Sequence, residues 1–218
     1  MLSCLIALRV ELKCLVVVAH PDDETIWMGG TIYRHSQWEW HILSMCRADD
    51  PDRAPRFWQV VRELGVSGYM SDLDDSPVLA SILLSEIKER IKSLVPEQFD
   101  LLFTHGPRGE YTRHLRHEQV HSAVREMVES GDLTADMLFF AYEDCGGKCN
   151  PQPAKDAQIR INLSAGEYAE KKHIVRDIYG FGEGSFEFKS LGTVEAFRVY
   201  GEDMDVNRIL AILEDIHI

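Results

Sequence analysis

Short apolar runs rich in β-branched residues alternate with longer amphipathic stretches along this chain, and this alternation constrains the fold most strongly. The first run, Cys14-Leu-Val-Val-Val-Ala19, is short, β-branched and apolar, so it predicts a buried strand. Strands that alternate with helices favour an α/β fold with a mainly parallel sheet. The expected strands cover residues 14–19, 40–45, 100–104, 137–141 and 195–200. The expected helices cover residues 24–37, 55–64, 76–94, 115–128 and 165–179, with Gly65 closing the second and Ser76 and Pro77 starting the third.

The size and composition of the chain predict one globular domain. With 218 residues, 45% of them hydrophobic and 27% charged, the sequence is long and apolar enough for a sizeable core over residues 1–218. Its 23 basic and 36 acidic residues give a formal net charge of −13. We therefore expect no nucleic-acid partner, because binding to phosphates needs clustered Lys and Arg, although this sum does not forbid a local anion site.

Cysteine usage and the N-terminus bear on the cellular compartment. Five cysteines are scattered along the chain: Cys4, Cys14, Cys46, Cys145 and Cys149. This odd set makes a poor disulfide framework, so we expect mostly reduced thiols and a cytoplasmic protein. A metal role for the last two, which flank a Gly-Gly-Lys turn, is the weaker alternative. The apolar residues 2–8 follow no basic residue and are too short to span a bilayer, so no stable membrane insertion is expected.

A dense charged motif, His20-Pro21-Asp22-Asp23-Glu24, follows the first expected strand directly. Burying one imidazole and three carboxylates is costly unless something compensates the charge, and a divalent cation is the simplest compensation. Imidazole and carboxylate ligands suit zinc, and a catalytic zinc needs three protein ligands and one open position. Pro21 stiffens the turn, so one carboxylate can bind metal while the other faces the metal-bound water. The alternative is an acidic turn that caps a helix.

A second histidine-rich motif, His114-Leu115-Arg116-His117, stands at the start of the helix expected over residues 115–128. Residues three or four apart share a helix face, so His117 could complete a ligand set while His114 reaches the reacting group from the helix start. We expect His121, four residues further on, to be an ordinary helix-face residue.

Several of these polar residues fall at the ends of expected strands. In parallel sheets ligands bind beyond the carboxyl ends of the strands, and His20 and His105 both lie there. For His105 two interpretations stay open, lining the cleft or capping the strand. No G-x-G-x-x-G sequence follows the first strand, which disfavours a dinucleotide cofactor.

The two motifs together resemble those of the PIG-L/LmbE-like de-N-acetylases. The run from His20 to Glu24, followed by Gly29-Gly30, is similar to the opening motif of that family. Gly109-Glu110-Tyr111 and the run from His114 to His117 are similar to its second motif. Further points of resemblance are Arg53 ahead of a helix ending Leu64-Gly65-Val66, the acidic residues Asp72, Asp74 and Asp75, the segment Tyr168-Ala-Glu-Lys171-Lys172, and Glu195-Ala-Phe197. The resemblance thus covers nearly the whole chain.

The resemblance implies a fold, a set of site residues and a reaction. The fold would be a Rossmann-like α/β domain with helices on both faces of the sheet and a metal site at its carboxyl edge. The metal ligands would be His20, Asp23 and His117. Asp22 would be the general base, His114 would act on the developing oxyanion or as an acid, and Arg53 would contact substrate. The substrate would be a small-molecule sugar conjugate, an N-acetylglucosamine derivative whose acetyl group is removed by attack of a zinc-bound water.

Some alternatives stay open. The family usually has Pro-Asp between its two histidines, where this chain has Leu115-Arg116. Arg116 either lowers the pKa of His114 or points to solvent. The sequence does not distinguish Zn²⁺ from Fe²⁺, identify the rest of the conjugate, or decide between a monomer and a homo-oligomer. The competing functions are an amidase acting on another N-acyl or thiol-conjugate substrate and a metal- and sugar-binding protein with weakened turnover.

Overall fold

A seven-stranded sheet organises the fold. The computed structural model describes residues 11–76, 81–111 and 113–214 of the chain. In sheet order, the strands are β3 (Ser67–Met70), β2 (Glu39–Ser44), β1 (Lys13–Val18), β4 (Gln98–Thr104), β5 (Thr134–Phe140), β9 (Val194–Val199) and β8 (Ile159–Asn162). The first five pair in parallel, whereas β9 pairs antiparallel with β5 and β8 pairs antiparallel with β9. The predicted α/β fold with a mainly parallel sheet is confirmed.

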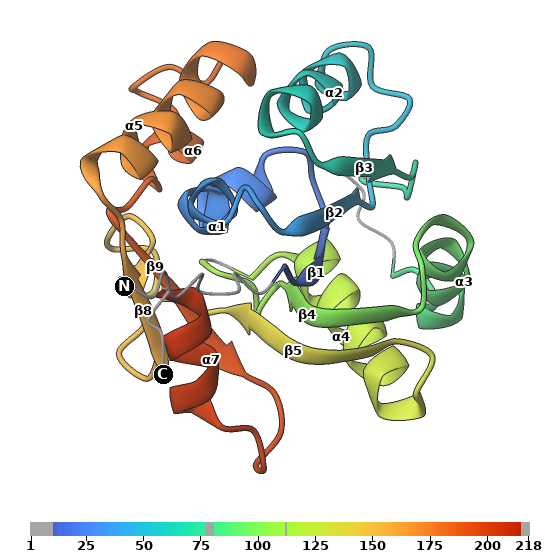
Figure 1. Ribbon diagram of the computed structural model, residues 1–218. Coiled ribbons are helices and arrows are strands. Elements are labelled where there is room, and N and C mark those ends of the chain that lie inside the picture. Colours follow the sequence, from blue (N-terminus) through green and yellow to red (C-terminus); the bar gives the residue numbers. More distant parts are fainter. Residues whose placement is uncertain (1–10, 77–80, 112, 215–218) are drawn as a thin grey trace, which may run out of the picture.

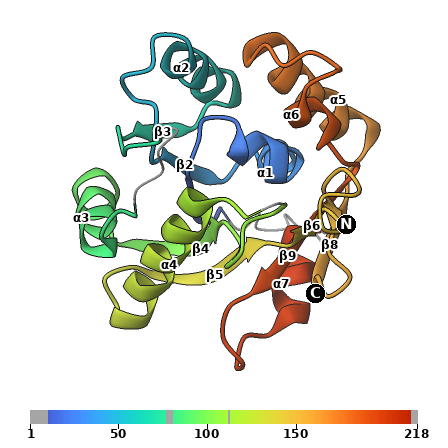
Figure 2. The same cartoon turned by 180° about the vertical axis from the view of Figure 1, so that it is seen from behind.

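Helices cover both faces of this sheet (Figures 1 and 2). On one face lie α1 (Asp23–Arg34), α2 (Arg53–Leu64), α5 (Ala165–His173), the π-helical turn η1 (Ile174–Ile178) and α6 (Phe186–Lys189), and on the other lie α3 (Leu84–Leu94) and α4 (Leu115–Ser130). The last helix, α7 (Val206–Leu213), packs against β8. Among the described residues, we find no helix with the length and apolarity needed to cross a membrane.

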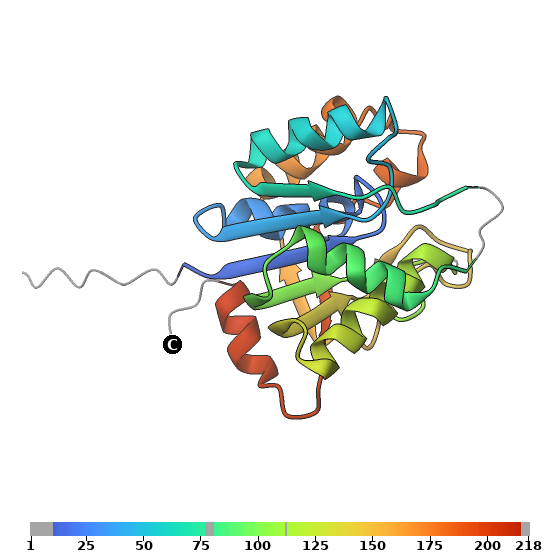
Figure 3. The same ribbon diagram turned by 90° about the vertical axis from the view of Figure 1, so that its right-hand side faces the viewer.

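The layers explain why the first strand is apolar from Cys14 to Val18. Side chains of a strand alternate between the faces of the sheet, so Val16 and Val18 pack into one core while Leu15 and Val17 pack into the other. Figure 3 shows β3, β2, β1 and β4 side by side, with α3 in front of them. Because both faces of β1 are covered, polar residues first become accessible where the strand ends.

The boundaries of two predicted helices need correction. The helix expected over residues 76–94 begins at Leu84, and Ser76 lies in a loop where its hydroxyl bonds to Asp74, so the predicted capping role is wrong. Pro77 lies outside the described residues. Neighbouring Asp75 lies within 3.3 Å of the His20 ring.

The helix expected over residues 24–37 ends at Arg34 and is broken at Met28, where φ is −149°. Gly30, just after the break, allows a close approach, because a Cβ there would lie 2.5 Å from the side chain of Leu163. By contrast, the helix expected to end before Gly65 does so, with that glycine in the left-handed conformation at φ 68°.

A disulfide-closed hairpin follows β5. Its strands β6 (Tyr142–Glu143) and β7 (Gln152–Pro153) pair antiparallel, and Cys145 and Cys149 form a disulfide in the loop between them. The expectation of reduced thiols is therefore wrong for this pair: their Cα atoms lie 5.6 Å apart, as disulfide geometry requires. Cys14 and Cys46 are free and buried, and Cys4 lies outside the described residues.

Candidate active site

The polar residues of both sequence motifs meet beyond the carboxyl ends of β1 and β4, which are neighbours in the sheet. His20 and Asp23 follow β1, His105 follows β4, and His117 lies in the first turns of α4. A cavity of about 260 Å³ opens beside them. The predicted residues that line it are His20, Asp22, Asp23, Arg53 and His114, and the ring of His117 lies directly behind His20. The structure thus brings all six predicted site residues together.

The turn after β1 sends its two aspartates in different directions. Asp22 has a φ of 125°, which is strained for a residue other than glycine. Its carboxylate faces the cavity, 3.5 Å from Nη1 of Arg53. The Asp23 carboxylate turns inward, where it accepts hydrogen bonds from the backbone N–H of His20 and the indole N–H of Trp27. The divergence expected from the Pro21 turn is present.

Three potential metal-binding atoms converge at this point. Nδ1 of His20 lies 3.2 Å from Oδ2 of Asp23 and 3.2 Å from Nε2 of His117, which in turn lies 3.4 Å from the same Asp23 oxygen. Bonds of about 2.0–2.1 Å around a tetrahedral zinc would separate two ligand atoms by about 3.3 Å. The spacing and the chemistry of these donors therefore fit a tetrahedral divalent metal.

Hydrogen bonds fix which histidine nitrogens face the converging atoms. Nδ1 of His117 lies 2.7 Å from Oε2 of Glu110, so it carries the proton and leaves the lone pair of Nε2 directed at Asp23 and His20. Although burial opposes its ionisation, the imidazoles of His105 and His117 lower the pKa of Glu110 to about 2. A carboxylate behind a ligating histidine is the usual way to orient the ring toward a metal.

His105 is close enough to the cluster to be counted as a ligand, since Asp23, His105 and His117 also place three donor atoms near one another. However, its Nε2 accepts a hydrogen bond of 2.8 Å from the backbone N–H of Ala19, and its Nδ1 donates to Glu110. Both ring nitrogens are engaged, so His105 supports the site by stacking on His117, with ring centroids 3.8 Å apart.

The environment of Asp22 suits proton transfer. Burial and the charge of neighbouring Asp23 raise the pKa of Asp22 well above its usual value, and the Arg53 guanidinium opposes that shift. A carboxylate with a raised pKa is closer to the proton affinity that a general base needs near neutral pH. Arg53 itself is held against Phe181, with its guanidinium carbon 4.4 Å from the ring centroid.

His114 stands at the N-terminal end of α4 and lines the cavity. Its ring centroid lies 4.9 Å from that of His20 and 4.4 Å from that of His117. Burial and these two imidazoles lower the pKa of His114 to about 4, so the ring is neutral at pH 7. Within the part of the chain that the structure describes, its Nδ1 has no hydrogen-bond partner.

Arg116 takes neither of the two directions expected for it. Its side chain is fully buried, and its guanidinium donates to the backbone carbonyl of Asp74 and to the side chain of Gln119. The alternative in which it points to solvent is wrong. The shift in the pKa of His114 comes instead from burial and from the other histidines.

Several residues of the site escaped the sequence reasoning. Asp75, named in the sequence analysis only as part of an acidic stretch, lies 3.3 Å from Nε2 of His20 and is held by Arg47 at 2.7 Å. His121, expected on an ordinary helix face, is buried and bonds through Nδ1 to the carbonyl of His105. The sequence marked Glu110 only as a member of the motif Gly109-Glu110-Tyr111. Its distance along the chain from His105 and His117 matches neither helix nor strand periodicity, so its contact with them was not predicted.

The fold and this site define a Rossmann-like α/β protein with a candidate metal centre at the carboxyl edge of its sheet. The chain belongs to the PIG-L family: the model of that family, described as GlcNAc-PI de-N-acetylase, matches residues 15–128. A search of curated protein sequences gives no match.

Solved structures with the same fold include a deacetylase and a hydratase. The conserved protein TT1542 from Thermus thermophilus is 17% identical, with a TM-score of 0.64 over 90% of this chain and 98% of that one. N,N'-diacetylchitobiose deacetylase from Pyrococcus horikoshii is 18% identical, with a TM-score of 0.63 over 86% and 84%. The 4-carboxy-2-hydroxymuconate hydratase GalB from Pseudomonas putida KT2440 is 13% identical, with a TM-score of 0.62 over 88% and 98%. At these identities the likeness establishes the fold, so the reaction must be argued from the site.

Proposed function

We propose that this protein is a metal-dependent hydrolase that removes the acetyl group from an N-acetylglucosamine-type conjugate, and that residues 1–218 act as one domain. The observation that carries the proposal is the triangle of His20 Nδ1, Asp23 Oδ2 and His117 Nε2, with sides of 3.2–3.4 Å, beside a cavity that holds a second carboxylate. Membership of the PIG-L family and the deacetylase among the structural neighbours support the choice of an acetamide over other substrates.

In this proposal the triangle holds zinc, although iron(II) suits the same nitrogen and oxygen donors. The metal would supply a Lewis acid that polarises a carbonyl group and lowers the pKa of water. His20 and His117 bind it as neutral imidazoles, with their outer nitrogens facing Asp75 and Glu110 respectively.

The remaining cavity residues perform the proton transfers. Asp22 takes a proton from the attacking water, and its raised pKa makes that transfer effective near neutral pH. Neutral His114 donates a hydrogen bond to the oxyanion that forms as the water oxygen bonds to the acetamide carbon. The C–N bond then breaks, and Asp22 returns its proton to the leaving amine, so acetate and a free amino sugar result. Arg53, at the wall of the cavity, contacts substrate and keeps Asp22 in place.

The decisive experiment pairs metal analysis with an acetate-release assay. Purified protein should contain about one equivalent of zinc or iron and should release acetate from N-acetylglucosamine derivatives. Removing the metal with a chelator should abolish release, and adding back each metal in turn identifies the active one. Metal-loaded protein that releases no acetate from these derivatives would contradict the proposal, and cleavage of a different acyl group from a panel of N-acyl substrates would favour the amidase alternative.

A further inference from the structure

Arg116 is a fully buried cation in the first turn of α4. A buried charge is costly unless protein groups face it. The Nε atom of Arg116 donates to the backbone carbonyl of Asp74, and its Nη1 donates to the side-chain oxygen of Gln119. Its Nη2 also lies 3.8 Å from Oδ2 of Asp74. Since Arg116 and Gln119 share a face of α4, this side chain ties the start of the helix to the loop before α3.

The loop that Arg116 contacts leaves the sheet at Leu73. Up to that residue the segment follows β2, and the N–H of Leu73 bonds to the carbonyl of Met45 at 2.9 Å. Asp74 comes next, and its carbonyl accepts from the Arg116 guanidinium. The arginine therefore holds the backbone of this segment at the point where pairing with β2 ends.

The carbonyl held by Arg116 is one peptide bond away from Asp75. Because a peptide group is planar, a hydrogen bond to the Asp74 oxygen fixes the direction of the plane that ends at the Cα of Asp75. The Asp75 carboxylate lies 3.3 Å from Nε2 of His20 and 2.7 Å from Nη2 of Arg47. Two arginines thus set the position of a carboxylate that faces the outer nitrogen of a proposed metal ligand.

The contact at Nε2 determines where Nδ1 of His20 points. While Nε2 donates to Asp75, Nδ1 is directed at the Asp23 oxygen and at Nε2 of His117, each 3.2 Å away. A carboxylate behind a ligating histidine fixes the orientation of its ring. If Asp75 moves away, the His20 ring can rotate out of the triangle of donor atoms.

We infer that Arg116 is a positioning residue for His20, acting through the Asp74 carbonyl and the Asp75 carboxylate. This role depends on the proposed function, because it takes His20 to be a metal ligand. The family usually has an aspartate where this chain has Arg116. In this chain the residue supports the metal site through the loop before α3 and leaves His114 to the cavity.

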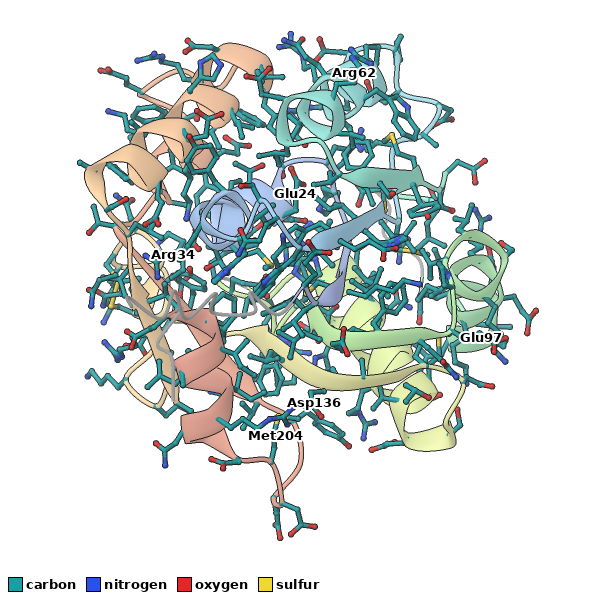
Figure 4. The ribbon with its side chains drawn as sticks, viewed as in Figure 1. Glu24, Arg34, Arg62, Glu97, Asp136 and Met204 are labelled. Atoms are coloured by element: carbon teal, nitrogen blue, oxygen red, sulfur yellow. A yellow bond between two sulfur atoms is a disulfide. The ribbon has the colours of Figure 1, made fainter. Side chains whose placement is uncertain are left out.

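The test is the zinc affinity of folded full-length variants, measured by competition with a chelating dye. Arg116→Met removes the guanidinium, and Asp75→Ala removes the carboxylate behind His20. Asp75→Ala should bind zinc about 10–100-fold more weakly than the wild type, and Arg116→Met about 10-fold more weakly, the usual range for lost support behind a ligating histidine. Arg62→Met is the matched control and should bind zinc as the wild type does, because Arg62 is an exposed cation on α2 (Figure 4).

A double variant separates a positioning role from a merely structural one. If Arg116 acts through Asp75, Arg116→Met/Asp75→Ala should bind zinc no more weakly than Asp75→Ala alone. Two results would overturn the inference. One is an Arg116→Met variant with a lowered Tm but wild-type zinc affinity. The other is a loss in Arg116→Met that multiplies with the loss in Asp75→Ala.

The same measurements separate this role from the proposed function. The expected pattern of zinc affinities in a protein that releases no acetate would confirm the role of Arg116 and contradict the proposed function. A wild type that binds no zinc would overturn both. If Arg116→Met does not fold, Arg116→Lys takes its place with the same pattern expected, because lysine keeps the charge but lacks the forked donors of arginine.

Discussion

Two clusters of buried ionisable groups lie along α1, and they satisfy their charges in opposite ways. Near the middle of the helix, the Glu195 carboxylate accepts hydrogen bonds from the backbone N–H groups of Gly30 and Thr31, the Thr31 hydroxyl and the Lys171 ammonium, at 2.6–2.9 Å. Every acceptor in this cluster faces a donor of the protein. At the start of the helix, in contrast, His20, Asp23 and His117 direct potential metal-binding atoms toward one another.

The comparison shows how to tell a structural charge from a functional one when both are buried. Buried charge is tolerated when the protein supplies its partners, as at Glu195, and it marks a ligand site when its lone pairs converge. The break at Met28 separates the two clusters along α1. Asp23 lies before the break, and the N–H groups that follow it are capped by Glu195. Each cluster should therefore respond differently to the loss of one member.

Removing a member of the converging set should have the largest effect. We expect Asp23→Ala to lose bound zinc, because one of three protein ligands is gone. Since the metal contributes several kcal/mol to catalysis, acetate release should fall about 10³-fold or more. The free energy of unfolding of the metal-free protein should fall by about 1–3 kcal/mol, since the buried indole N–H of Trp27 loses its acceptor. Metal analysis and denaturant titration measure the two, with exposed Asp203→Ala as the control. Full zinc retention would remove Asp23 from the proposed ligands.

The next variant tests whether the cavity carboxylate belongs to the metal set. Asp22→Asn keeps the shape of the side chain but cannot take up a proton. We expect zinc to remain bound while kcat falls about 10²–10⁴-fold, the usual worth of a positioned general base. Steady-state kinetics and metal analysis of the same preparation decide the matter. A variant with wild-type turnover would show that another group activates the water.

The satisfied cluster should respond in stability and leave the metal in place. Glu195→Ala leaves the buried Lys171 without its partner, which typically costs about 3–5 kcal/mol of the free energy of unfolding. At about 2–4 °C per kcal/mol, the Tm should fall by roughly 6–20 °C. Zinc per folded molecule should stay at the wild-type value.

A double variant checks the reason for that loss. Because Glu195→Ala/Lys171→Met removes both charges, it should recover part of the lost stability relative to Glu195→Ala alone. Thermal unfolding of the two variants supplies the comparison. Zinc lost from a fully folded Glu195 variant would show that the clusters are not independent.

The strand–helix alternation predicted most of the fold, and the two histidine motifs predicted most of the candidate site. Each expected strand is present within a few residues, because buried parallel strands are continuous apolar runs. Strand β3 was missed, since Ser67-Gly68-Tyr69-Met70 is short and lacks that pattern. The glycine is needed because a Cβ at Gly68 would lie 2.4 Å from the Val61 side chain, a tertiary contact that no local pattern reveals.

Within the site, the sequence predicted the residues that cluster in short motifs. It did not predict the contacts made between segments that are distant in the sequence. His20, Asp22 and Asp23 are adjacent in sequence, whereas Glu110 reaches His105 and His117 only through the fold of a loop. The burial of Arg116 likewise depends on the Asp74 carbonyl, which belongs to a different segment. The proposed roles of the six site residues stay predictions until variants are measured.

Glu110 belongs to both kinds of cluster, which makes it the sharpest test of the distinction. Its carboxylate is fully buried and accepts hydrogen bonds from the His105 and His117 rings and from the Gly106 N–H, so its charge is satisfied as at Glu195. Yet one of its donors is a proposed metal ligand. Glu110→Gln keeps the volume but turns an amide NH₂ toward an N–H donor on one side or the other, and one hydrogen bond must be lost.

If Glu110 serves only the fold, that loss should lower stability and leave metal affinity unchanged. If it orients His117, zinc affinity should fall about 10–100-fold, the usual effect of removing a carboxylate behind a metal-ligating histidine. We expect the second result, because the lone pair of His117 Nε2 faces Asp23 only while Nδ1 donates to Glu110 at 2.7 Å. Competition with a chelating dye measures the affinity. The control is Glu118→Gln, which alters a carboxylate on α4 that is paired with the exposed side chain of Arg113. Equal zinc affinity in both variants would place Glu110 with the structural cluster.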